Sequence, residues 1–222
     1  NEFEKFDRIV TISDECVKSL IQTYPMMAEK FINIPNLTSA SLLRKLSESY
    51  VPEEYKEKTS CCKLLSIGRL SEQKGFDYAI DAAKLLKDQG ICFCWFIIGD
   101  GQLRNSLQVQ IENNDLTDCV KLLGIRSNPY PYIKKADIII QTSRFEGKSV
   151  VLDEAKILAC PIVVTNYPTV QDQIQNGKEG VIVEMNPNSI ANGIILLWNN
   201  KDLRDSIIHY LEQNCYDNSQ RI

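Results

Sequence analysis

The sequence has a single histidine, His209, among 222 residues. Histidine is the general base of the Ser-His-Asp and Cys-His mechanisms, and His209 stands alone in a late amphipathic segment. The sequence therefore argues against a hydrolase that uses a histidine-activated nucleophile.

Zinc-binding spacing is missing from the eight cysteines. None forms a C-x2-C pair and only one histidine could assist, so we expect no metal site. Cys92, Cys94 and Cys160 lie in apolar segments, where a free thiol packs as a small hydrophobe. We therefore expect reduced thiols, as in a cytoplasmic protein.

Long apolar runs and an excess of positive charge are also missing. No hydrophobic stretch approaches the ~20 residues of a membrane-spanning helix, and the net charge of −4 argues against a nucleic-acid-binding protein with a broad basic face. The hydrophobic content of 44% and charged content of 24% are those of an ordinary globular protein.

Short apolar segments alternate with helical patterns along most of the chain. The predicted strands of the main domain are 63–68, 91–98, 120–124, 138–140, 161–165 and 181–183. This alternation predicts an α/β fold, with a Rossmann-like parallel sheet flanked by helices. Residues 1–36 contain one small β-α-β unit, residues 37–62 are a predicted linker with a short helix at 40–48, and residues 63–222 form the main domain.

The most informative stretch is residues 137–160, which combines a buried strand, a polar turn and a helix. Gly147 is free to adopt a positive φ in the turn. A strand, turn and helix form a crevice at the carboxyl end of a parallel sheet, where open α/β sheets bind ligands. We expect the free amides of Ser149, Val150 and Val151 to form an anion site at the helix N-terminus, suited to phosphate.

Two further turns follow predicted strands. Arg69 and Lys74 lie on one of them and can converge on a single dianion. Gly99 and Gly101 lie on the other. Arg104 occupies the position of the third glycine in a G-x-G-x-x-G fingerprint, which disfavours NAD binding.

Glu146 and Glu154 are separated by seven residues after a strand. They resemble the E-x7-E motif of GT-B glycosyltransferases, most closely family 4, and residues 68–75 resemble the G-R-x4-K-G element of the same family. The resemblance covers nearly the whole chain, with its specific motifs within residues 63–183. It implies a C-terminal donor-binding domain preceded by a remnant of the N-terminal acceptor domain. Since the first residue is Asn1, we expect the chain to begin inside a longer protein.

The resemblance also assigns roles. Glu146 contacts the donor sugar, whereas Arg69 and Lys74 neutralise the diphosphate, and we take these three as the catalytic residues. Glu154 binds the ribose hydroxyls. The other implied donor-binding residues are Gly68, Gly99, Gly101, Arg126, Ser149, Val150 and Val151. No cofactor or metal is expected, because the cations and helix amides supply the positive potential for a nucleoside diphosphate sugar, most simply a UDP-sugar.

The implied reaction is retaining transfer of a hexose to the hydroxyl of a glycan or lipid-linked glycan, in the synthesis of cell-surface polysaccharide or glycoconjugate. The enzyme would be cytoplasmic, with the full-length protein associating peripherally with the membrane, and the present chain alone is expected to be inactive in transfer. One alternative is a GT-B sugar-nucleotide 2-epimerase, which needs catalytic histidine that His209 does not provide. Another is a non-catalytic nucleotide-sugar-binding module.

The chain departs from the family pattern in two loops. Pro168 and Thr169 replace a glycine-rich turn, with Asp172 near the position of a family glutamate. Lys148 stands where relatives often have an aromatic residue.

Overall fold

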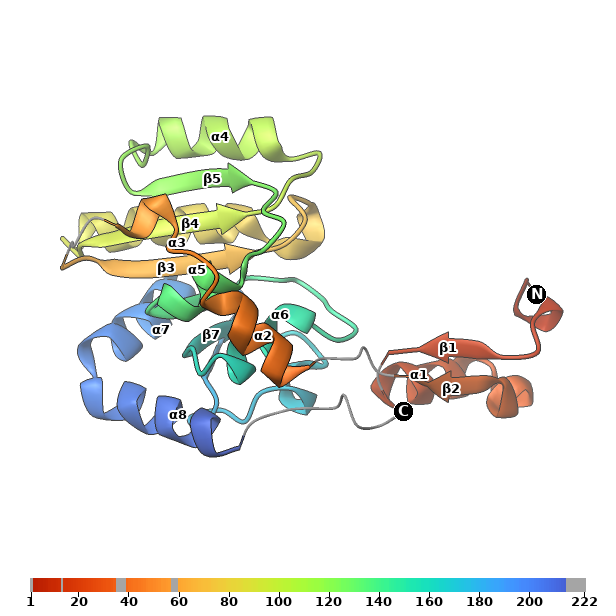
Figure 1. Ribbon diagram of the computed structural model, residues 1–222. Coiled ribbons are helices and arrows are strands. Elements are labelled where there is room, and N and C mark those ends of the chain that lie inside the picture. The colour runs from red at the N-terminus through yellow and green to blue at the C-terminus, as the bar shows by residue number, and fades with distance from the viewer. Residues whose placement is uncertain (1, 13, 35–38, 57–59, 215–222) are drawn as a thin grey trace.

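The computed structural model describes residues 2–12, 14–34, 39–56 and 60–214 (Figure 1). Its centre is a six-stranded parallel sheet with the strand order β5-β4-β3-β6-β7-β8. The strands are β3 (Cys62–Ile67), β4 (Phe93–Ile98), β5 (Val120–Gly124), β6 (Ile138–Gln141), β7 (Ile162–Thr165) and β8 (Val181–Val183). Every residue of β6 and β7 is buried, as expected of central strands covered on both faces. The predicted α/β fold is confirmed.

Helices cover both faces of this sheet. On one face, α3 (Phe76–Asp88), α4 (Arg104–Asn113), α7 (Pro187–Asn199) and α8 (Lys201–Gln213) contribute to one apolar core. On the other, α5 (Tyr130–Lys135) and α6 (Val150–Ile157) contribute to a second core. The strand order reverses between β3 and β6, so the loops after these strands flank the switch point where such sheets bind ligands.

Residues 2–34 form a small unit beside the sheet (Figure 1). In it, β1 (Ile9–Thr11) pairs in parallel with β2 (Phe31–Asn33), and α1 (Asp14–Thr23) connects them. Two 3₁₀ helices, η1 (Glu2–Lys5) and η2 (Pro25–Lys30), complete it. This is the predicted β-α-β unit. Ser13, at the expected end of its first strand, and the Pro35-Asn36 pair, expected after its second strand, lie outside the described residues.

Much of the segment predicted as a linker packs against the sheet. Helix α2 (Ala40–Ser47) buries Leu43 in a small cluster with Ile157. The 3₁₀ helix η3 (Glu53–Tyr55) places the Tyr55 ring 5.1 Å from that of Phe96, between ring centroids. Residues 57–59 are outside the described part. The domain boundaries themselves stay a prediction, although these apolar side chains attach the segment to the larger domain.

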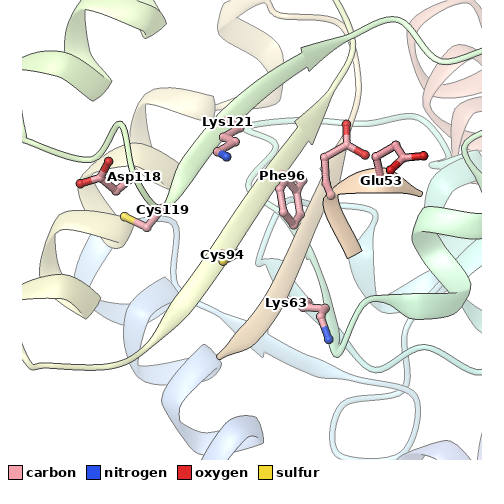
Figure 2. Close-up of a pocket in the computed structure, with 8 residues that line it drawn as sticks. Glu53, Lys63, Cys94, Phe96, Asp118, Cys119 and Lys121 are labelled. Atoms are coloured by element: carbon pink, nitrogen blue, oxygen red, sulfur yellow. The ribbon is translucent and has the colours of Figure 1, made fainter. Parts of the chain in front are cut away.

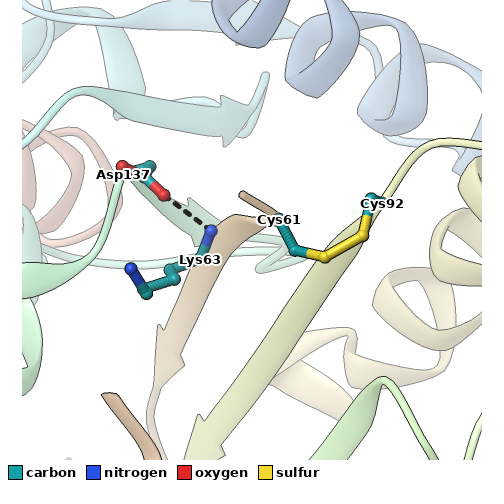
Figure 3. The surroundings of a disulfide bond; sticks show 4 residues. All are labelled: Cys61, Lys63, Cys92 and Asp137. Carbon is teal, nitrogen blue, oxygen red and sulfur yellow. Dashed lines mark hydrogen bonds between the residues drawn. A yellow bond between two sulfur atoms is a disulfide. The ribbon is translucent and has the colours of Figure 1, made fainter. Parts of the chain in front are cut away.

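The expectation that all thiols are reduced is wrong for one pair. Cys61 and Cys92 form a disulfide with a Cα–Cα distance of 4.7 Å (Figure 3). Cys62 and Phe93, the first residues of β3 and β4, are paired, so Cys61 and Cys92 lie next to each other just before these neighbouring strands. The sequence does not show which strands are neighbours. Among the described cysteines, those outside disulfide bonds are Cys16, Cys62, Cys94, Cys119 and Cys160.

Two further findings apply to residues 2–12, 14–34, 39–56 and 60–214. No helix there combines the length and apolar character needed to cross a membrane. No group of three histidine, cysteine or acidic side chains there is arranged to hold a metal ion.

Candidate functional site

Glu146 and Lys74 contact each other beside the carboxyl ends of β3 and β6. Lys74 Nζ lies 2.5 Å from Glu146 Oε1, and the Ser143 hydroxyl donates to the same oxygen at 2.7 Å. Gln73 Nε2 donates to Glu146 Oε2 at 3.3 Å. The Glu146 side chain is only 8% exposed, so Lys74 compensates a largely buried negative charge. The family resemblance assigned Lys74 to the diphosphate and Glu146 to the sugar of a donor, and in the structure the two side chains are in contact.

Arg69 has a different environment on the same loop. Its side chain is exposed, and within the described chain no hydrogen bond or ion pair is recorded for it. The stem of Lys74 passes over Gly68, where an added Cβ would lie 3.2 Å from both Cδ and Cε. Arg69 is therefore the more accessible of the two cations that the sequence placed here.

Gly99 and Gly101 allow the turn after β4 to pass against the loop after β3. A Cβ at Gly99 would lie 1.8 Å from the Gly68 carbonyl oxygen, and one at Gly101 would lie 2.4 Å from that of Leu70. Gly99 also has a φ of 142°. These glycines were predicted to admit a nucleotide. The close contact present is between two protein loops, and contact with a nucleotide stays a prediction.

The N-terminus of α6 differs from the expected open anion site. The Ser149 amide is not free, because it donates to Gln173 Oε1 at 2.7 Å. The Ser149 hydroxyl does not cap its helix either, since it donates to Gln141 Oε1 at 2.6 Å. For the amides of Val150 and Val151, no hydrogen bond is recorded in the described chain. The expectation is therefore wrong for Ser149 and stays open for the other two.

Gly147 lies in this turn without the positive φ that the sequence suggested. A Cβ there would lie 3.4 Å from Cys16 Sγ of α1, so the residue marks the approach of the small unit. A cavity of about 270 Å³ lies beside it. The cavity is lined by Asp14, Lys18, Asn33, Gly147, Lys148, Asp172 and Gln173.

Glu154 accepts a hydrogen bond from the Tyr130 hydroxyl at 3.0 Å. Burial raises the pKa of the Glu154 carboxyl, and the bond from Tyr130 partly offsets this. Burial and the neighbouring carboxylate raise the pKa of Tyr130 to about 12. Nothing in the sequence signals this contact between α5 and α6.

The guanidinium of Arg126 is hydrogen-bonded to groups of the protein itself. It donates to the Leu123 carbonyl at 2.6 Å, to the Tyr132 hydroxyl at 3.1 Å and to Glu54 Oε1 at 3.3 Å. The side chain thus connects the loop after β5 to η3. Its implied role in donor binding stays a prediction.

A second cavity, of about 190 Å³, lies on one face of the sheet and contains none of the predicted site residues. Figure 2 shows it over β3, β4 and β5, between Glu53 and the lysines Lys63 and Lys121. Glu54, which accepts a hydrogen bond from Arg126, is one of its lining residues, so the cavity lies next to Arg126.

The chain resembles known proteins in both sequence and structure. Residues 52–214 match the family model described as "Glycosyl transferases group 1". The amylovoran biosynthesis glycosyltransferase AmsK of Erwinia amylovora is 36% identical over 126 residues, covering 53% of this chain and 31% of the relative. The Escherichia coli UDP-Gal:alpha-D-GlcNAc-diphosphoundecaprenol alpha-1,3-galactosyltransferase is 26% identical, covering 94% of this chain and 54% of the relative.

Solved structures show the same fold. Anabaena HepE in complex with UDP and glucose superposes with a TM-score of 0.81 and 20% identity, covering 95% of this chain and 59% of HepE. A TarM variant of S. aureus, in a complex that includes UDP, gives a TM-score of 0.79 at 22% identity, covering 95% of this chain and 41% of TarM.

The chain spans between 31% and 54% of the length of the two curated relatives described. The family model nevertheless covers most of the present chain, including both glutamates and both cations of the site. The chain therefore belongs to the group 1 glycosyl transferase family.

Proposed function

We propose that the protein transfers a sugar from a UDP-sugar to a hydroxyl group of a glycan or lipid-linked glycan, and that this chain holds the donor site. The observation that carries the proposal is the contact between Lys74 and Glu146 at the carboxyl ends of β3 and β6, with Arg69 exposed on the same loop as Lys74. Such an arrangement suits a diphosphate leaving group, on which negative charge builds as the sugar departs.

The positive potential would come from the protein itself. Arg69 offers a planar guanidinium to two phosphate oxygens. The amides of Val150 and Val151 add partial positive charge at the helix N-terminus. Lys74 can share its ammonium between Glu146 and a phosphate, since it has three donors. We infer metal-independent transfer from this set.

The two glutamates would hold the sugar and the ribose. Glu146 is paired with Lys74, and its carboxylate oxygens can also accept hydrogen bonds from sugar hydroxyls. Glu154 gives one oxygen to Tyr130, which leaves the other for a ribose hydroxyl. Retention of anomeric configuration is part of the proposal, on the family pattern of the E-x7-E motif.

The comparisons support the donor and acceptor classes. The E. coli relative is named for UDP-Gal and a diphosphoundecaprenol-linked sugar, and both solved structures described above contain UDP. We therefore propose a UDP-sugar donor, a glycan or lipid-linked acceptor, and action at the cytoplasmic face of a membrane.

Calorimetric titration of the chain with UDP, GDP and ADP, each with and without EDTA, tests the donor site. Saturable binding of UDP that EDTA does not change is the expected result. Binding of GDP or ADP alone would contradict the UDP assignment, and loss of binding in EDTA would contradict metal independence. Absence of binding for all three would overturn the proposed donor site.

A further inference from the structure

Four buried polar residues, Tyr167, Gln141, Ser149 and Gln173, are connected in a hydrogen-bonded relay. Gln141 Nε2 donates to the Tyr167 hydroxyl at 3.2 Å, and the Ser149 hydroxyl donates to Gln141 Oε1 at 2.6 Å. Gln173 then binds the Ser149 backbone twice, accepting from its amide at 2.7 Å and donating to its carbonyl at 3.0 Å. All four residues are at most 7% exposed. Buried polar groups are costly unless paired, and here each pairs with a member of the relay.

The relay replaces the usual cap of α6. A serine at this position normally accepts a hydrogen bond from an amide of the first turn, but Gln141 takes the Ser149 hydroxyl. In a capping box, a glutamate or glutamine three residues later would bind the Ser149 amide. That position is Leu152, and Gln173 from a distant loop supplies the bond instead. The orientation of Ser149 is thus fixed by tertiary contacts.

The loop that carries Gln173 holds both ends of the turn containing Glu146. At one end, the Thr169 hydroxyl donates to the Glu146 carbonyl at 2.7 Å. At the other end, Gln173 holds Ser149. Gln173 is itself fixed by Lys156, whose Nζ donates to its carbonyl at 2.8 Å. The same loop is the one where Pro168 and Thr169 replace the family's glycine-rich turn.

We propose that Gln173 is a positioning residue for donor binding. By holding Ser149 through both of its backbone groups, it fixes the turn that carries Glu146 and the start of α6 against the nucleotide diphosphate. This inference rests on the proposed function. It goes beyond it because it assigns part of the geometry of the site to Gln173, which is outside the predicted donor-binding residues and holds Ser149 through its backbone.

Substitution by glutamate provides a pH-controlled test. A protonated glutamate at 173 offers a donor and an acceptor, as glutamine does, whereas an ionised one only accepts and faces the Ser149 carbonyl oxygen. The charged groups around this position belong to α1, to the Glu146 turn, to α6 and to the loops after β7. They are Asp14, Lys18, Lys148, Asp153, Lys156, Asp172 and Glu179.

The experiment compares Gln173→Met and Gln173→Glu with the wild-type chain and with Gln171→Glu, which adds the same charge at an exposed position of the same loop. UDP affinity is measured by calorimetry from pH 5 to 8.5, with the melting temperature recorded for each variant. We expect Gln173→Met to weaken binding at least tenfold at every pH. Gln173→Glu should match it at pH 8.5 and recover towards wild type at pH 5, while Gln171→Glu should follow wild type throughout.

The possible failures are distinguishable. Wild-type binding that both Gln173 variants retain at every pH would overturn the positioning role alone. A Gln173→Glu variant whose affinity relative to wild type is as low at pH 5 as at pH 8.5 would overturn the hydrogen-bond assignment. Because Gln173→Glu is compared with wild type at each pH, a lower melting temperature of Gln173→Met does not decide the result. A wild-type chain that binds no UDP would overturn the proposed donor, and this inference with it.

Discussion

At the scale of single residues, the two cations of the candidate site differ in whether a carboxylate of the protein is paired with them. Lys74 is paired with Glu146, whereas Arg69 is exposed with no recorded partner in the described chain. The sequence presents these two cations as equivalent members of one loop. In the structure the two differ, because the Lys74 side chain reaches Glu146 in the turn after β6 and that of Arg69 is exposed.

Replacing each cation by alanine should therefore have different consequences. We expect Arg69→Ala to weaken UDP binding by ~1.5–3 kcal/mol, the contribution of a charge-assisted hydrogen bond, with no change in melting temperature. Lys74→Ala should weaken binding and also lower the melting temperature, because it leaves the buried Glu146 carboxylate without its counter-ion. Calorimetry and thermal unfolding measure both effects.

Lys84→Ala is the matched control, since Lys84 pairs with Asp88 on the exposed side of α3. It should leave both quantities unchanged. Unaltered UDP affinity in Arg69→Ala would refute the assignment of Arg69 to the diphosphate.

The contact between Tyr130 and Glu154 predicts a pH dependence. Glu154 has a raised pKa because it is buried, and the bond from Tyr130 lowers that pKa. A ribose diol is held best by the ionised carboxylate, so UDP affinity should fall as pH decreases through the pKa of Glu154. Tyr130→Phe removes the bond that favours ionisation, and the fall in affinity should begin at a higher pH.

Calorimetric titration between pH 4.5 and 8 measures this shift, with Tyr210→Phe on α8 as the control. The shift should disappear with 2′,3′-dideoxy-UDP, which lacks the hydroxyl groups that Glu154 would bind. Identical pH profiles of Tyr130→Phe and wild type with UDP would contradict the role of Glu154.

At the scale of secondary-structure elements, the site depends on how closely two loops approach each other. The Leu70 amide donates to the Asp100 carbonyl at 3.0 Å, and the Leu103 amide donates to the Leu70 carbonyl at 3.1 Å. These bonds tie the loop after β3 to the turn after β4. They form only because Gly99 and Gly101 carry no side chain at the point of contact.

Gly99→Ala should consequently destabilise the protein more than an ordinary glycine substitution. Its Cβ would overlap the Gly68 carbonyl oxygen, so the two loops must separate, at a cost of about 2 kcal/mol or more in the free energy of unfolding. Gly90→Ala is the matched control. It also has a positive φ, but a Cβ there meets nothing within 4 Å.

Denaturant unfolding of the two variants separates steric contact from backbone strain. The control should lose ~1–2 kcal/mol, the cost of a left-handed conformation for a residue other than glycine. Equal losses in the two variants would mean that the loops do not depend on the contact at Gly99.

At the scale of the whole molecule, the candidate site lies where the small unit meets the sheet. Asp14, Lys18 and Asn33 of residues 2–34 line the same cavity as Gly147 and residues that follow it. Asn33 Nδ2 donates to Asp14 Oδ1 at 2.8 Å, which fixes part of this wall. The turn carrying Glu146 thus lies next to both the small unit and the sheet, as the proposed transfer between a donor and an acceptor requires.

The sequence by itself determined the α/β class and the positions of the strands, because central parallel strands are short, continuous apolar runs between polar turns. It also identified Arg69, Lys74, Glu146 and Glu154 as candidate site residues, because each pair is spaced along a single strand-loop-helix unit. Their roles stay predictions.

Only the tertiary structure decided which groups contact each other across these units. Gln173 lies 24 residues from Ser149, and Tyr130 lies 24 residues from Glu154. Neither contact leaves a periodic or spacing signal. The Cys61–Cys92 disulfide is likewise a matter of which strands are neighbours. Hydrogen bonds and sulfur–sulfur bonds require distances of a few ångströms, and those are set only when the strands take their order in the sheet.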